Sequence, residues 1–122
     1  MREGKTLPFI FYKIRKKVQK MELKGFQRKY LRGLAHGYDP VVIIGQKGVT
    51  DSLIESIDEA LKTHELIKIR FNDFKEKDQK KEINDVIENR CKCEQVGMIG
   101  HISLFFRQNS NKEDQVIKVP MK

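Results

Sequence analysis

Apolar residues recur along the chain in two alternating patterns, which predict helices and strands in turn. Residues 26–37 and 50–64 place apolar side chains three or four positions apart, as amphipathic helices do. A third segment, around Ile83, Val86 and Ile87, repeats this spacing. Four runs rich in branched and aromatic residues predict strands between and after these helices: residues 41–44, 66–71, 95–99 and 102–106.

The order of these elements predicts the fold class. The sequence α-β-α-β-α-β-β is typical of a single compact α/β domain, with a mixed four-stranded sheet flanked by helices. Residues 41–44 are apolar without alternation, which predicts a strand buried on both faces. In residues 66–71, apolar and basic residues alternate, so Lys68 and Arg70 are expected to point away from the core.

The two ends of the chain depart from this pattern. Residues 1–21 are a basic N-terminal extension, which we interpret as flexible or as the product of a start site placed upstream of Met21. The alternative is a basic arm that embraces nucleic acid. Residues 108–122 are a polar C-terminal tail, in which residues 116–119 predict a short edge strand ended by Pro120.

Composition narrows the class of protein. The 122 residues are 39% apolar and 34% charged, and no apolar run approaches the roughly 18 residues of a membrane helix. The net charge is +8, which favours an anionic partner. Residues 1–25 contribute +6 and residues 26–50 contribute +3, whereas the rest of the chain contributes −1.

Gly45-Gln46-Lys47-Gly48 is the segment with clear chemical content. It lies between a predicted strand and a helix that Thr50 can cap, where free backbone N–H groups and the helix dipole favour an anion. Two glycines allow positive φ and a close approach to a ligand, and Lys47 supplies a cation. This glycine loop suits a phosphodiester backbone, as the glycine-x-x-glycine loop of KH domains does. An ordinary strand-to-helix turn is the alternative.

The first predicted helix carries a basic face. Arg28, Arg32 and His36 recur every four residues, with Lys29 beside them. Because this helix and the glycine loop flank the same predicted strand, we expect both to line one surface.

These segments resemble the CRM domain family, whose stand-alone bacterial form is the YhbY-like RNA-binding protein. The resemblance covers residues 22–107 and is carried mainly by FQRKYLRGLAH at 26–36, PVV at 40–42, IGQKGVT at 44–50 and IDEAL at 57–61. It implies a fold similar to the C-terminal domain of translation initiation factor three. It also implies RNA binding through the loop residues Gly45, Gln46, Lys47 and Gly48 and the adjacent basic helix, and a role in assembly of the large ribosomal subunit.

Two further sets of residues invite a functional interpretation. Cys91 and Cys93 with His101 could suggest zinc, but a structural site needs four ligands, so we expect two free thiols. The aromatic residues Phe26, Tyr30, Phe71 and Phe105 all fit the core pattern, so we expect recognition of RNA shape and backbone more than of bases.

The sequence therefore predicts a non-catalytic, cytoplasmic RNA-binding protein. We expect a monomer that binds ribosomal RNA in large-subunit precursors and uses no cofactor, metal, membrane or small-molecule substrate. The alternative is a protein-interaction module that docks on a ribosomal protein and touches RNA incidentally. An enzyme acting on nucleic acid has little support, because no paired carboxylates or nucleophile–base pair accompany the loop.

Overall fold

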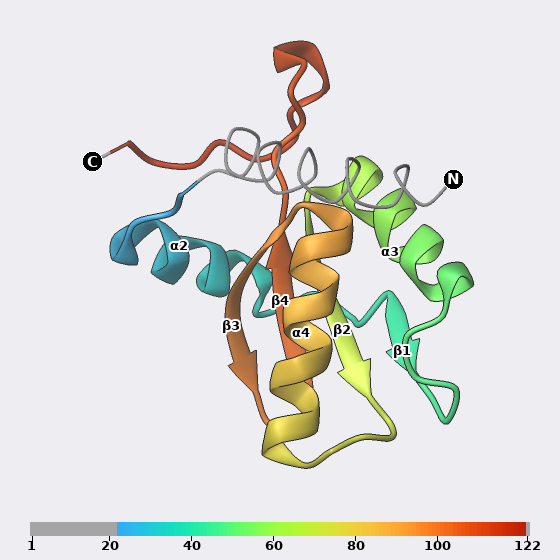
Figure 1. The fold of residues 1–122 in the computed structure, drawn as a ribbon. Coiled ribbons are helices and arrows are strands. Elements are labelled where there is room, and N and C mark those ends of the chain that lie inside the picture. Colours follow the sequence, from blue (N-terminus) through green and yellow to red (C-terminus); the bar gives the residue numbers. More distant parts are fainter. Residues whose placement is uncertain (1–21, 122) are drawn as a thin grey trace, which may run out of the picture.

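The computed structural model describes residues 22–121, which form a mixed four-stranded sheet with helices on both faces (Figure 1). The predicted extension at 1–21 lies outside the described residues. The strands have the spatial order β1-β2-β4-β3, with β1 parallel to β2 and the other neighbours antiparallel. This arrangement confirms the predicted fold class. The elements are α2 (Gly25–Ala35), β1 (Val42–Ile44), α3 (Asp51–His64), β2 (Leu66–Phe71), α4 (Lys77–Cys91), β3 (Glu94–Ile99), β4 (Ile102–Phe106) and the 3₁₀ helix η1 (Lys112–Asp114).

The first layer of the core lies between the sheet and the helices α3 and α4. Ile67 of β2 stands opposite Phe105 of β4, and both pack with Ile57 of α3 and Ile87 of α4. Figure 1 shows α4 lying along the front of the sheet. None of the helices within residues 22–121 combines the length and the apolar character needed to cross a bilayer.

The second layer covers the opposite face of the sheet. Leu104 and Phe106 of β4 pack there with Leu31 of α2. Ile117 and Val119 join the same cluster from the C-terminal segment, residues 108–121. Alternation along β4 thus sends neighbouring side chains to two separate cores.

β1 differs from the prediction of a strand buried on both faces. Val42 and Ile44 are buried against α3, but Val41 and Ile43 are about half exposed. The reason is its position at the edge of the sheet: α2 packs against β3, β2 and β4 and leaves the outer face of β1 uncovered.

The prediction of an edge strand at residues 116–119 is wrong, because this segment pairs with no strand of the described chain. Its alternating apolar residues are buried by packing on the second layer instead. A buried polar anchor, rather than a β-ladder, holds the segment in place.

That anchor is the Glu65 carboxylate, which is fully buried just after α3. Its Oε1 accepts hydrogen bonds from the backbone N–H groups of Val116 and Ile117, both at 2.8 Å. Its Oε2 accepts a third from the backbone N–H of Asn109 at 2.7 Å. A buried carboxylate is stable only where such donors replace water, so the charge and the C-terminal segment depend on each other.

Replacing Glu65 with alanine should lower the free energy of unfolding by roughly 3 kcal/mol or more, because hydrogen bonds to a charged group contribute about 1.5–3 kcal/mol each. Urea denaturation measures this change, and limited proteolysis should show faster cleavage within residues 108–121. Glu55→Ala is the matched control, because Glu55 is exposed on α3; it should change stability by less than about 0.5 kcal/mol. Equal stability of the two variants would contradict the anchor.

Candidate nucleic-acid interface

The glycine loop, Gly45–Gly48, is a tight turn at the end of β1. The backbone N–H of Gly48 donates to the carbonyl of Gly45 at 3.0 Å, which leaves Gln46 and Lys47 exposed at the tip. Gly48 has a φ of 67°, and a Cβ there would lie 3.3 Å from the Phe74 ring. Glycine at this position is therefore required by the turn itself.

Gly45 does not adopt the positive φ that was expected of both glycines. Its φ is not positive, and a Cβ at this position would meet nothing within 4 Å. The backbone turn needs only Gly48, since a single left-handed residue after the tip completes it. Gly45 can therefore be changed without straining the fold, which makes it the better probe of ligand approach.

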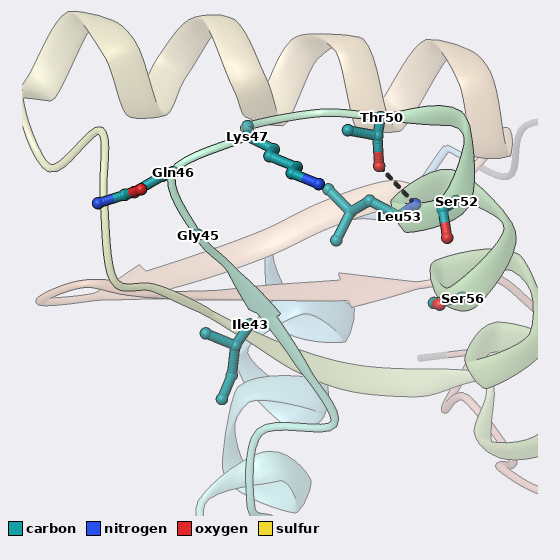
Figure 2. Close-up of a pocket in the computed structure, with 9 residues that line it drawn as sticks. Ile43, Gly45, Gln46, Lys47, Thr50, Ser52, Leu53 and Ser56 are labelled. Atoms are coloured by element: carbon teal, nitrogen blue, oxygen red, sulfur yellow. Dashed lines mark hydrogen bonds between the residues drawn. The ribbon is translucent and has the colours of Figure 1, made fainter.

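A shallow groove, the loop groove, runs between this turn and the first turns of α3 (Figure 2). Thr50 caps α3 as predicted, because its Oγ1 accepts from the backbone N–H of Leu53 at 3.0 Å. In Figure 2 the Lys47 side chain extends toward Leu53, and Gln46 points outward from the turn. The groove is lined by Ile43, Gly45, Gln46, Lys47, Gly48, Thr50, Ser52, Leu53 and Ser56.

Ser52 and Ser56 are members of the groove that the sequence pattern did not indicate. They lie one helical turn apart on α3, and both are exposed. With the unpaired N–H groups at the start of α3, their hydroxyls can donate to anionic oxygens. Their spacing of four residues was a usable signal, but only the docking of α3 shows that they border the loop.

The basic face of α2 has a different role from the one expected of it. Arg28 forms an ion pair with the buried Glu94 and donates to the carbonyl of Gln95 at 2.7 Å. Arg32 donates to the carbonyl of Val96 at 3.0 Å. These carbonyls belong to the edge strand β3, at its register shift, where they need partners other than a neighbouring strand. Both arginines therefore attach α2 to the sheet.

The sheet order also separates the two predicted halves of the site. The loop follows β1 at one edge of the sheet, whereas Arg28 and Arg32 contact β3 at the other. Lys29 and His36 remain exposed on α2. His36 lies beside β2, because its carbonyl accepts from the Lys68 amine at 3.3 Å.

Arg70 of β2 is a basic residue that the fold brings beside β1, the strand that leads into the loop. It stands beside Ile43 in the parallel ladder, so both side chains lie on the same face of the sheet, and Arg70 is exposed. Ile43 in turn lines the loop groove. The sequence predicted that Arg70 points away from the core, but the pairing register was needed to place it beside Ile43.

Two of the four aromatic residues assigned to the core are not in it. Phe71 and Phe105 are buried, as predicted, but Phe26 and Tyr30 are 40% and 42% exposed. The buried stripe of α2 consists of Gln27, Leu31 and Ala35. Phe26 and Tyr30 lie at its margin, since each precedes a stripe residue by one position.

Cys91 and Cys93 form no disulfide, and both are buried, a burial that the sequence pattern did not indicate. Burial, together with the nearby Asp58 charge, raises the pKa of the Cys91 thiol to about 11. Cys91 therefore stays protonated near neutral pH, which opposes metal ligation. Within residues 22–121, no group of three or more potential metal-ligating side chains comes together.

The family model of the CRS1 / YhbY (CRM) domain matches residues 23–107. This range includes α2, the loop groove and the whole sheet. The chain belongs to the CRM domain family. This match confirms the resemblance to the CRM family that was seen mainly in residues 26–61. The assignment of individual RNA-binding residues stays a prediction.

Several known proteins resemble this one over most of their length. An RNA-binding protein of Haemophilus influenzae is 36% identical over 96 residues, which cover 79% of this chain and 93% of that protein. The probable RNA-binding protein YqeI of Bacillus subtilis is 32% identical over 98 residues, covering 80% of this chain and 99% of YqeI. The solution structure of SAV1595 from Staphylococcus aureus, described as a candidate RNA-binding protein, superposes with a TM-score of 0.68 at 32% identity. It covers 81% of this chain and 100% of that one.

In this CRM protein, Arg28→Ala should lower the free energy of unfolding by about 2–3 kcal/mol, because the buried Glu94 carboxylate loses its ion-pair partner. We expect a smaller loss of stability than for a fully buried ion pair, because the Arg28 side chain is 35% exposed. Lys29→Ala, at the next position of the same helix, should leave stability within about 0.5 kcal/mol. Chemical denaturation of both variants checks this difference, and a stable Arg28→Ala protein would show that the arginine does not anchor α2.

Proposed function

We propose that this CRM protein is a non-catalytic RNA-binding protein of the cytoplasm. Its target is ribosomal RNA in precursors of the large subunit, where it acts as an assembly factor. The observation that carries the proposal is the loop groove, which combines the exposed Lys47, two hydroxyls and helix N–H groups; Arg70 stands beside Ile43, one of its lining residues.

The chemistry of this region suits a phosphate backbone. Neither Lys47 nor Arg70 forms an ion pair within residues 22–121, so both cations are available to a ligand. The groove is open along the edge of β1, which fits an extended chain better than an enclosed small molecule (Figure 2). Contacts of this kind position RNA without reading its sequence.

The choice of RNA rests on the comparisons and on the family resemblance. The Haemophilus and Bacillus relatives carry the name of RNA-binding proteins. The resemblance to stand-alone YhbY-like proteins adds large-subunit precursors as the target. A protein that binds mainly phosphates obtains its specificity from RNA shape, and folded ribosomal RNA offers such shapes.

Lys47→Ala should weaken binding to a labelled large-subunit rRNA fragment and reduce the slope of log affinity against log salt by about 1, because one phosphate contact is lost. Gly45→Asp should weaken binding further, since it places a negative charge in the groove at a position where a Cβ would meet nothing within 4 Å. Fluorescence anisotropy at several salt concentrations measures both effects.

Lys112→Ala is the matched control for these variants. It removes the same charge from the exposed η1, away from the loop (Figure 1). The control should retain the wild-type affinity and salt slope. If Lys47→Ala and Lys112→Ala have the same effect, or neither has one, the loop groove does not bind RNA.

The ribosomal target has a separate test. The wild-type protein should co-sediment with large-subunit precursor particles at low salt and dissociate at high salt, and Lys47→Ala should dissociate at lower salt. Co-sedimentation with small subunits alone, or with no ribosomal particle, would contradict this part of the proposal and leave RNA binding in place.

A protein-interaction module is the second candidate, and one observation favours it. Val41 and Ile43 at β1 and Ile99 at the end of β3 expose apolar surface, and Ile99 is 59% exposed. Such apolar surface could dock on a ribosomal protein. Association that survives nuclease treatment of an extract would favour this candidate over RNA binding.

A further inference from the structure

α2 presents two aromatic rings to solvent, away from the loop groove. Phe26 and Tyr30 lie one turn apart on the helix, and each keeps about two fifths of its surface exposed. One turn further along, Gly33 has no side chain, and a Cβ there would meet nothing within 4 Å. The outer face of α2 therefore offers two rings followed by an open space.

The C-terminal segment completes this surface. Pro120 lies against it, held by the Gln27 side-chain amide, which donates to the Pro120 carbonyl at 2.9 Å. The result is a shallow, mainly apolar groove, which we call the aromatic groove: Phe26, Lys29, Tyr30, Gly33, Leu34 and Pro120. Pro120 follows the range matched by the CRM family model, so part of the groove comes from outside that range.

The charge around the aromatic groove is positive. α2 contains Arg28, Lys29 and Arg32 and no acidic residue. Arg28 and Arg32 are engaged with β3, but Lys29 has no partner within residues 22–121. The available cation thus lies at the border of the aromatic groove.

We propose that the aromatic groove binds unpaired RNA bases by stacking on Phe26 and Tyr30, with Lys29 contacting the adjoining phosphate. This inference rests on the proposed RNA binding and specifies that the bound RNA includes a single-stranded segment. Aromatic faces accept any base, and each stack contributes about 1–3 kcal/mol. A nearby cation distinguishes a polyanionic ligand from an apolar peptide, which would gain nothing from Lys29.

The test uses variants that remove the rings but keep apolar bulk. Phe26→Leu and Tyr30→Leu should each weaken binding of a labelled single-stranded RNA oligonucleotide roughly 5- to 150-fold, the range that corresponds to one lost stack. Binding of a duplex RNA of the same length should be unchanged, because its bases are already paired and stacked. Both side chains lie at the margin of the buried stripe, so the variants should stay folded, which urea denaturation checks.

Tyr30→Phe distinguishes stacking on Tyr30 from a purely structural role of this residue. It retains a ring and should keep the wild-type affinity. The chain has three tyrosines and no tryptophan, so stacking on Tyr30 should quench the intrinsic fluorescence when RNA binds. Tyr30→Phe should lose most of this quenching without losing affinity.

The outcomes separate this inference from the proposed function. If the wild-type protein binds single-stranded RNA and both leucine variants bind it equally well, stacking is overturned and phosphate binding at the loop stands. Leucine variants that keep RNA affinity but lose an apolar peptide or protein ligand would also overturn stacking. If the wild-type protein binds neither single-stranded nor duplex RNA, the proposed function itself fails.

Discussion

The buried charge of Glu65 is the constraint on which much of this molecule depends. Glu65 links α3 to β2, its carbonyl accepts from the backbone N–H of Arg107 at the end of β4, and its carboxylate holds the C-terminal segment. Water is excluded there, so the carboxylate must be satisfied by protein donors. Those donors hold the segment from which Ile117 and Val119 pack on the second layer, and Gln27 then holds Pro120 against α2. Part of the second layer and one side of the aromatic groove therefore depend on how this segment is held.

The basic residues of α2 are of two kinds: those that satisfy buried or unpaired polar groups of the protein, and one that does not. Arg28 and Arg32 donate to carbonyls of β3 at its register shift, and Arg28 also neutralises the buried Glu94. Lys29 has no hydrogen-bond or ion-pair partner within residues 22–121, so its charge is available to a ligand. Guanidinium groups, with several donors in a plane, suit the bonding of backbone carbonyls at an irregular strand, whereas a lysine suits a single phosphate. A basic helix face is therefore not in itself a nucleic-acid surface.

The loop groove and the aromatic groove offer RNA different kinds of contact. The loop groove supplies cations and hydrogen-bond donors at the edge of β1, where contacts with phosphates are independent of sequence. The aromatic groove supplies ring faces beside one lysine on α2, where contacts require unpaired bases. An RNA that engages both would combine a structured region with a single-stranded one.

The order of the elements, the mixed sheet, the cap at Thr50 and the glycine turn could all be predicted from the amino-acid sequence, which was also sufficient to recognise the CRM family. These features depend on local periodicity and turn chemistry, which neighbouring residues encode. Tertiary structure alone decided that β1 is an edge strand with Ile43 exposed, that residues 116–119 pack without pairing, and that Phe26 and Tyr30 lie outside the core. It also decided that Arg28 contacts β3 while Arg70 stands beside Ile43 of β1. These outcomes depend on register and on which face another element covers, and both are set by contacts between residues far apart in the chain.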